Sequence, residues 1–279
     1  MAATLVMPAA GTHWVHGLTR GEHTVRLVKR SESPWATSTF GGFVAARGGV
    51  VLNAPAARQR QVEFIGDSYT AGYGNMSAGR DCTGDEVGRT TNVDRAFGAL
   101  TARRLGADYQ VNAFSGRGMV RNYNGIEPGT DYRTYYDRAL LAVSGDVWRK
   151  PAGWRPQLVV VGLGINDFST ALNPGEPWTP ESLVAAYKTA YHGFLDELRA
   201  RYGSDTVIVV SATHMSNTTA FADATRQVVA ERGDDRVRHW YYDNTGLDYL
   251  GCHWHPSAHD HQVISERLDA FVATLPLRW

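Results

Sequence analysis

VEFIGDSYTAGYGN, residues 62–75, is the stretch of sequence that decides the fold. Its apolar start, residues 62–65, is typical of a strand, and Gly66 marks where that strand ends. The turn that follows brings Ser68 to the edge of a sheet. A serine in this place can act as a nucleophile if a base and a set of oxyanion donors meet it in space. Taken alone, Gly-Asp-Ser is equally consistent with an ordinary helix cap.

From Gln61 onward, strand and helix patterns alternate. Thr179 followed by Pro180 is a typical helix start, a capping side chain and then proline at the first helical position. Such alternation predicts an α/β fold, a mostly parallel sheet with helices on both faces and an active site beyond the carboxyl ends of its strands. The expected strands are 62–65, 109–113, 158–163, 207–212 and 237–242, and the expected helices are 92–105, 132–144, 180–202, 219–232 and 256–274.

The first 60 residues follow a different pattern. Residues 23–29 (HTVRLVK) alternate apolar and polar side chains, and residues 41–52 form an apolar stretch punctuated by glycine. Both patterns predict strands and turns. Residues 53–60, rich in Ala, Pro and Arg, have the composition of a linker. We therefore expect a β-rich segment at 1–60 and an α/β domain at 61–279.

Composition excludes several classes of partner. The chain has 279 residues, and its 28 Lys and Arg balance its 28 Asp and Glu, so neither nucleic acid nor an anionic membrane is expected as a partner. No apolar run is long enough to span a bilayer. Residues 1–10 do not read as a signal peptide, which leaves open an export signal already removed or a start inside a longer gene product.

The two cysteines, Cys82 and Cys252, do not form a C-x-x-C pair, so a structural zinc site is not expected, and we predict no cofactor. If Ser68 and His255 meet, the two cysteines also come close to one another. A disulfide there and a pair of reduced thiols are both left open.

Ester chemistry needs a nucleophile, a proton acceptor and donors for the developing oxyanion. His255, on the loop before the last expected helix, can accept the proton of Ser68 because imidazole titrates near neutral pH. Asn166 offers a side-chain amide, and Gly116 offers a backbone N–H with no side chain in the way. Taken alone, His255 is better interpreted as an ordinary loop histidine on the surface, and Asn166 and Gly116 could be a turn asparagine and a turn glycine. Their occurrence in this order, near strand ends, favours a hydrolase.

These blocks resemble the SGNH (GDSL-type) hydrolase superfamily, whose emblem residues would be Ser68, Gly116, Asn166 and His255. The similarity extends over most of residues 21–270 and is greatest to carbohydrate esterase family 2, because its first block is specific to that family. The blocks are GEHTVRLVKR (21–30), VEFIGDSYTAGYGN (62–75), SGRGMVRNY (115–123), LVVVGLGINDFS (158–169) and GCHWHPS (251–257).

The resemblance implies a flavodoxin-like, doubly wound parallel sheet of five strands, preceded by a β-sandwich (jelly-roll) domain. Residues 1–60 would supply only the later part of that sandwich, as in a truncated chain. It also implies a secreted serine esterase that removes acetyl groups from xylan or related plant polysaccharides through an acetyl-serine intermediate. Its partner would be the acetylated carbohydrate, and we expect a monomer.

One departure concerns the residue that orients His255. The superfamily places an aspartate three residues before this histidine, where Cys252 stands, and family 2 often places an acid two residues before it, where His253 stands. Asp248 is a further candidate, but we rank it below a backbone carbonyl. The working hypothesis is therefore a serine–histidine dyad, in which a missing carboxylate lowers the rate without abolishing it.

Four residues are candidates for lining the substrate cleft: Trp254, Tyr73, Asn75 and Trp178. Trp254 could stack on a sugar ring or pack against the last helix. Asp67, just before the candidate nucleophile, is expected to accept hydrogen bonds from nearby backbone and hold the turn.

Three rival interpretations stay open. A lipase or thioesterase on the same scaffold would need an apolar trough, which no loop obviously supplies. A carbohydrate-binding protein with weakened catalysis would explain the missing acid. The histidines at 253, 255, 259 and 261 could ligate a metal, but the last two would point in different directions from the start of a helix, so we predict none.

Overall fold

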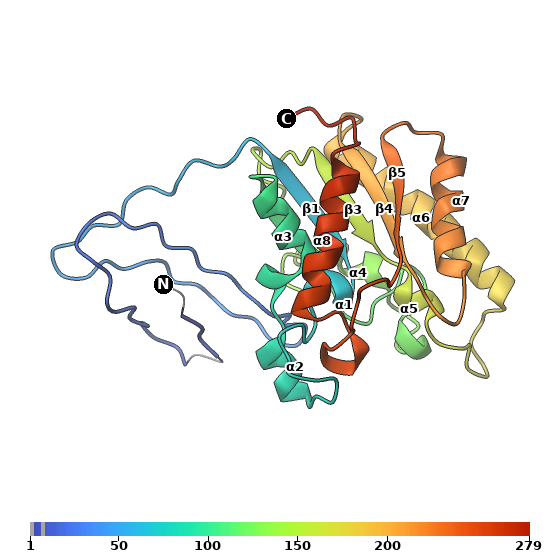
Figure 1. Cartoon of the computed structure of the whole chain (residues 1–279), viewed down its shortest axis with the longest axis horizontal. Helices are drawn as coiled ribbons and strands as arrows, with labels where there is room; N and C mark the ends of the chain where they lie inside the picture. Colours follow the sequence, from blue (N-terminus) through green and yellow to red (C-terminus); the bar gives the residue numbers. More distant parts are fainter. Residues whose placement is uncertain (1–2, 7–8) are drawn as a thin grey trace.

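A computed structural model describes residues 3–6 and 9–279 of the chain (Figure 1). Five parallel strands form one sheet in the order β2-β1-β3-β4-β5. This is the strand order of flavodoxin-like doubly wound folds, so the predicted fold class is confirmed. The strands are β1 (Gln61–Gly66), β2 (Asp108–Ala113), β3 (Leu158–Gly162), β4 (Val207–Thr213) and β5 (Val237–Tyr242).

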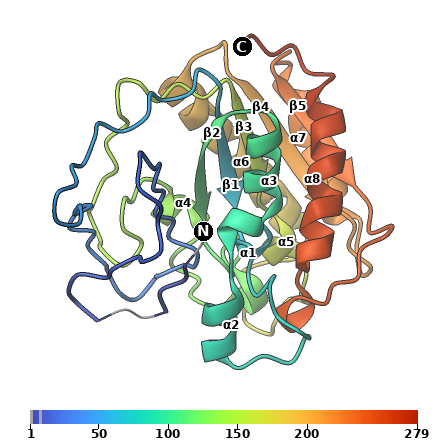
Figure 2. The same ribbon diagram turned by 60° about the vertical axis from the view of Figure 1, so that its left-hand side comes forward.

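Helices cover both faces of this sheet (Figures 1 and 2). The α-helices are α1 (Ser68–Ala71), α2 (Gly84–Thr90), α3 (Phe97–Arg104), α4 (Tyr132–Tyr136), α5 (Ile165–Phe168), α6 (Pro180–Tyr202), α7 (Ala220–Arg232) and α8 (Ala258–Val272). Three short 3₁₀ turns are η1 (Val93–Arg95), η2 (Tyr123–Gly125) and η3 (Cys252–Trp254).

The core lies in two layers because strand side chains alternate between the two faces. On one face, Val159 and Val161 of β3 pack with apolar residues of α4, α6 and α7. On the other face, Leu158 and Val160 pack with α3 and α8. Burying each such side chain contributes about 1.5–3 kcal/mol to folding. Because the sheet is packed on both faces, the carboxyl ends of its strands hold fixed positions.

Most expected elements occur within about two residues of their predicted bounds, but two helices differ. The helix expected at 92–105 breaks at Ala96, whose backbone is extended, so it becomes η1 and α3. The helix expected at 132–144 ends at Tyr136. Beyond it the chain turns back at Gly145, where φ is 80°, and Arg138 pairs with Val147 in an antiparallel bridge.

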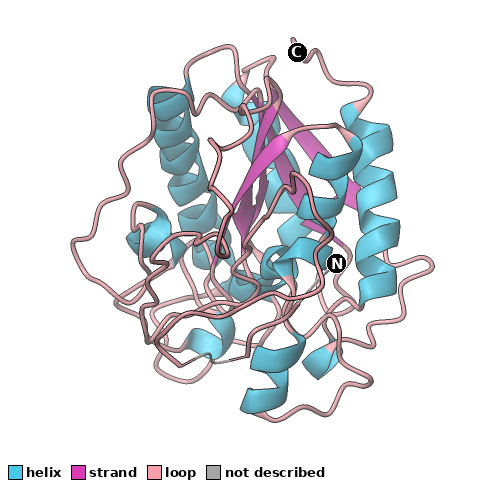
Figure 3. Cartoon of the chain, turned by 90° about the vertical axis from the view of Figure 1, so that its left-hand side faces the viewer, coloured by secondary structure: helices cyan, strands magenta, loops and turns pink. Residues whose placement is uncertain are grey.

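The segment before β1 forms no strand within the described residues 3–6 and 9–60, and Figure 3 draws it as loop. The strands expected at 23–29 and 41–52 are therefore wrong for this structure. An alternating segment becomes a strand only when a neighbouring strand accepts and donates its backbone hydrogen bonds. Here the segment has no such neighbour within the described residues, and its apolar side chains Val25 and Leu27 are exposed. The domain boundary near residue 60 stays a prediction. None of the helices in the described residues combines the length and apolarity that a membrane span requires.

Candidate active site

The carboxyl ends of three neighbouring strands bring the predicted residues to one edge of the sheet. In the strand register, Gly66 of β1 lies beside Ala113 of β2 and Gly162 of β3. Gly66 must be glycine because a Cβ there would lie 2.1 Å from the hydroxyl oxygen of Thr70, on α1. The close return of α1 onto β1 thus places Ser68 directly at the edge.

Ser68 and His255 meet at this edge although 187 positions separate them in the sequence. The Nε2 atom of His255 lies 2.9 Å from the Oγ of Ser68. On the other side of the ring, Nδ1 lies 2.9 Å from the carbonyl oxygen of Cys252 and 3.2 Å from that of His253. Because a carbonyl only accepts, Nδ1 carries the proton, and the lone pair of Nε2 faces the serine hydroxyl.

Backbone carbonyls, rather than Asp248, therefore orient the imidazole. The ring is packed beside Tyr73, with ring centroids 4.4 Å apart, and against the edge of Tyr69 at 5.6 Å. Burial disfavours the charged imidazolium and lowers the pKa of His255 to about 4, although the two carbonyls oppose the shift. The neutral ring can therefore accept a proton throughout the neutral pH range.

The two other emblem residues follow β2 and β3 at the same edge of the sheet. Asn166 is 4% exposed, and its amide nitrogen donates to the carbonyl of Arg117 at 2.9 Å and, more weakly, to Asp67 at 3.3 Å. Gly116 has a φ of 79°, a conformation that favours glycine, and a Cβ there would meet no atom within 4 Å. Its backbone is thus open on the side where a side chain would project.

Two buried aspartates support this edge. Asp67 accepts from the backbone N–H of Tyr69 at 3.0 Å, as expected for a residue that holds the turn. Asp167, which the sequence reasoning did not single out, accepts from the N–H groups of Met119, Val120 and Arg121 at 2.8–2.9 Å. Burial raises the pKa of Asp67 to about 7 and that of Asp167 to about 6. Through its three hydrogen bonds, Asp167 ties the loop after β2 to the loop after β3.

The sequence carries no separate signal for Asp167, because its partners come together only in the folded chain. A Cβ at Gly118 would lie 2.5 Å from a carboxylate oxygen of Asp167, so the loop can approach the carboxylate only with glycine there. Arg121, also buried, donates to Glu176 in a bidentate ion pair, which lowers the pKa of Glu176 to about 2. Neither contact can be inferred from either residue alone.

Residues 248–257, which we call the base loop, carry His255 and are held from both sides. Cys82 and Cys252 form a disulfide, one of the two alternatives left open by the sequence. The N–H of His253 donates to the carbonyl of Arg80 at 2.7 Å. Gly74, with φ of 55°, lies against Cys252 so closely that a Cβ would be 2.3 Å from the Cβ of the cysteine. The base loop is thereby fastened to the segment that follows the nucleophile.

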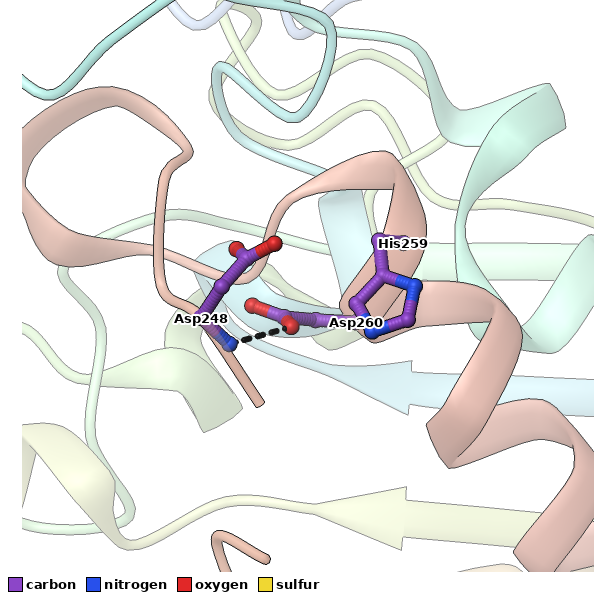
Figure 4. A group of neighbouring side chains, drawn as sticks. All are labelled: Asp248, His259 and Asp260. Carbon is purple, nitrogen blue, oxygen red and sulfur yellow. Dashed lines mark hydrogen bonds between the residues drawn. The ribbon is translucent and has the colours of Figure 1, made fainter. Parts of the chain in front are cut away.

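Asp260 holds the base loop at its other side (Figure 4). Its buried carboxylate accepts from the backbone N–H groups of Asp248 at 2.7 Å, Tyr249 at 2.8 Å and Ser257 at 3.0 Å. Asp248, His259 and Asp260 place ligand atoms within 4.8 Å of one another. Because three N–H donors already point at the Asp260 carboxylate, this cluster fits the role of a loop clasp better than that of a cation site.

The four histidines considered as metal ligands have separate partners. His253 contacts the carbonyl of Cys82 at 2.9 Å, and His259 contacts that of Gly246 at 3.2 Å. His261 is buried, accepts from the N–H of Phe97 at 3.2 Å, and stacks on that ring. With His255 facing Ser68, the histidines do not converge on one point.

Two of the four candidate substrate contacts lie next to the site. Tyr73 packs on His255, and its hydroxyl lies 3.1 Å from Nδ1 of His253. Trp254 is 65% exposed, so the alternative of packing against the last helix does not hold. The guanidinium of Arg80 lies 3.8 Å from the centroid of the Trp254 ring, and this cation–π contact holds the indole against Arg80.

The other two candidates do not present a free surface at the site. Asn75 is 1% exposed, and its side chain exchanges both hydrogen bonds with the backbone of Asn92, at 3.0 and 3.1 Å. Its expected contact with substrate is therefore corrected to a structural role. Trp178 is half-buried and packs against the core next to α6, so a contact with substrate stays a prediction.

Comparisons with known proteins agree with this geometry. The GDSL-like Lipase/Acylhydrolase family matches residues 64–263, and the Carbohydrate esterase 2 N-terminal family matches residues 2–55. An acetylxylan esterase / glucomannan deacetylase of Cellvibrio japonicus (strain Ueda107) is 42% identical over 258 residues, 91% of this chain and 70% of the relative. Cellulase/esterase CelE of Acetivibrio thermocellus is 32% identical over 264 residues, 92% of this chain but 30% of the relative.

A solved structure gives the same result. It is described as a carbohydrate esterase whose active site displays divergent catalytic and non-catalytic binding functions. It is 42% identical to this chain, with a TM-score of 0.74, and the match covers 79% of this chain and 70% of the solved one.

Proposed function

This chain belongs to the GDSL-like lipase/acylhydrolase family and is a carboxylic ester hydrolase, and we propose that it removes O-acetyl groups from carbohydrate with Ser68 as nucleophile. The observation that carries the proposal is the 2.9 Å contact between Ser68 Oγ and the unprotonated Nε2 of His255. The printed activity of the Cellvibrio relative supports acetylated xylan or glucomannan as the substrate class.

In the proposed reaction, Ser68 Oγ attacks the acetyl carbonyl carbon while His255 Nε2 takes the serine proton. The same proton then passes to the sugar oxygen as its bond to the carbonyl carbon breaks, which leaves an acetyl-serine. A water molecule next attacks this ester and gives its proton to His255. Collapse of the second tetrahedral intermediate returns the proton to Ser68 and releases acetate.

Three donors would hold the oxyanion: the backbone N–H groups of Ser68 and Gly116 and one N–H of Asn166. The amide of Asn166 has one well-made bond, to Arg117, and one long bond, to Asp67 at 3.3 Å. The N–H of Asn166 that makes the long bond to Asp67 loses little when it donates to the oxyanion instead. Charge-assisted hydrogen bonds are about twice as strong as neutral ones.

The base acts in this proposal without a carboxylate partner. The carbonyl of Cys252 fixes the tautomer and the tilt of the His255 ring, which is the positional part of an acid's role. It does not supply the negative charge that would stabilise imidazolium in the transition state. We therefore place this enzyme among serine–histidine dyads, with His255 neutral in the resting state.

The surroundings support a small acyl group on a sugar. Trp254 is an exposed indole next to His255 in the chain, a side chain suited to stacking on a pyranose ring, and Tyr73 packs on His255. We extend the proposal to a monomer that acts outside the cell on plant polysaccharide. The Cys82–Cys252 disulfide, a bond typical of oxidising compartments, supports that location.

A chain-length series tests the proposal. Wild type should hydrolyse 4-nitrophenyl acetate and release acetate from acetylated xylan or glucomannan, with activity falling sharply from acetyl to butyryl and octanoyl esters. Ser68→Ala should abolish both activities while its circular dichroism and melting temperature stay as in wild type. A preference for the octanoyl ester would transfer the assignment to a lipase, and turnover by Ser68→Ala would refute the nucleophile.

A further inference from the structure

The turn that carries Gly116 is held on three sides by the α/β domain. The N–H of Phe114 donates to Gly66 at 3.0 Å and thereby extends the pairing of β2 with β1. The carbonyl of Gly116 accepts from the N–H of Tyr123 at 2.9 Å, and the carbonyl of Arg117 accepts from Asn166 at 2.9 Å. These bonds fix both ends of the turn, and a longer bond of 3.3 Å from the N–H of Arg117 to the carbonyl of Phe114 closes it, but none of them is made by Ser115 or by the N–H of Gly116.

The remaining contact comes from the segment before β1. Glu32 reaches across 83 positions in the sequence to Ser115. One oxygen of its carboxylate accepts from the backbone N–H of Ser115 at 2.6 Å, and the other accepts from the Ser115 hydroxyl. The bidentate contact therefore grips the residue immediately before Gly116.

The part of the segment around Glu32 is docked on the α/β domain. The N–H of Val93 donates to the carbonyl of Arg30 at 3.0 Å. Arg26 donates to Asp94 at 2.9 Å and to the hydroxyl of Tyr109, on β2, at 2.6 Å. Residues 30–34 are half-buried, while residues 20–27 and 35–44 are exposed. Glu32 thus sits in a half-buried stretch that lies against the domain.

We propose that Glu32 is a positioning residue for the oxyanion donors, which makes the segment before β1 part of the active site. It holds Ser115 so that the N–H of Gly116 points to the place where the acetyl oxygen becomes negative. The inference rests on the proposed function, because it assigns Glu32 a role in that same reaction.

The physical reason lies in Gly116. Glycine tolerates many backbone conformations, so a turn with glycine at φ of 79° that is closed by a 3.3 Å hydrogen bond has little stiffness of its own. A donor aimed at an oxyanion is effective only when it is already oriented before the reaction. The Glu32 carboxylate supplies two acceptors that match the two donors of Ser115 and so removes the freedom of the turn at the residue next to the donor.

Steady-state kinetics on 4-nitrophenyl acetate test this role. Glu32→Ala should lower kcat by about 10- to 100-fold with KM within about twofold, because a misplaced donor raises the barrier and leaves ground-state binding intact. Glu32→Gln keeps an acceptor for the Ser115 N–H and should recover most of kcat. Ser115→Ala should lose about two- to fivefold, and the double variant Glu32→Ala, Ser115→Ala should be no slower than Glu32→Ala alone, because both changes break one contact.

The control is Glu22→Ala, which removes an exposed acid from the same segment and should keep wild-type kcat and melting temperature. A Glu32→Ala protein that melts earlier but keeps wild-type kcat would overturn the proposal and make the contact a docking contact only. Losses that multiply in the double variant would overturn it as well. If Glu32→Ala does not fold, wild-type kcat in Ser115→Ala, for which a two- to fivefold loss is expected, has the same meaning. A separate Ser68→Ala sample reports on the proposed function itself, so the two failures are distinguishable.

Discussion

The nucleophile and the base of this site are held in opposite ways. Ser68 and the oxyanion donors follow three neighbouring strands, and buried carboxylates, chiefly Asp167, tie their loops together. His255 lies on the base loop between β5 and α8, where the Cys82–Cys252 disulfide and backbone hydrogen bonds hold the chain. The sheet edge thus supplies preorganised polar groups, whereas the base depends on the shape of one loop.

The largest expected effect concerns the two residues that join these regions. His255→Ala should lower kcat by about 10⁴-fold or more, and combining it with Ser68→Ala should lower kcat no further, because the pair acts as one unit. Single-turnover measurements on 4-nitrophenyl acetate check this. Independent, multiplying losses would break the link between the two regions.

Next in size is the loss of an oxyanion donor on the nucleophile side. Asn166→Ala should reduce kcat by about 10²–10³-fold and change KM little, because the amide contributes mainly in the transition state. Its melting temperature should also fall, since the carbonyl of Arg117 loses its donor. Unchanged kcat would remove Asn166 from the oxyanion donors.

The disulfide tests the base side. Replacing Cys82 and Cys252 together by serine should cost about 2–5 kcal/mol in the free energy of unfolding, because the bond closes a loop of 170 residues. Since Cys252 also supplies the carbonyl that orients His255, kcat should fall about tenfold, as the ring loses its alignment. Denaturant unfolding and kinetics on the same sample measure both. Full kcat in a destabilised protein would show that backbone bonds alone hold the base.

The smallest expected effect is that of placing an aspartate at position 253, where family 2 often has an acid. His253 has φ of 52°, and its ring faces Cys82 and Tyr73, so an aspartate there would point away from Nδ1 of His255. His253→Asp should therefore keep kcat within about threefold of wild type. The pH profile of kcat/KM should show one acid limb near pH 4 in both proteins, because activity is lost only when His255, with its pKa lowered to about 4, takes up a proton.

A limb that moves toward pH 6 or 7 in His253→Asp would show that the new carboxylate reaches the imidazole and raises its pKa. A limb near pH 6 in wild type that disappears in Asp167→Asn would instead assign rate control to the nucleophile side, where burial raises the pKa of Asp167 to about 6. Either result would revise the contrast between the two regions.

Much of the fold and of the central site could be predicted from local pattern. Alternating strands and helices predicted the parallel sheet, and Ser68, Gly116 and Asn166 lie at its carboxyl edge because parallel strands end at the same edge. Local pattern was not enough to predict the strands expected before β1, because a strand needs a neighbouring strand to pair with and not only an alternating sequence. Helix bounds failed at Ala96 and Tyr136, where turns with their own hydrogen bonds compete with the helix.

What the sequence by itself determined is the order of chemistry along the chain: a nucleophile, an amide and an imidazole, each placed near the end of a regular element by short-range periodicity. Only the tertiary structure decided which groups hold them. The Cys252 carbonyl behind His255, the pairing of Asn75 with Asn92 and the reach of Glu32 to Ser115 join residues through loops of irregular shape. Such contacts depend on how loops from distant parts of the chain pack together, a property that no local pattern of residues contains.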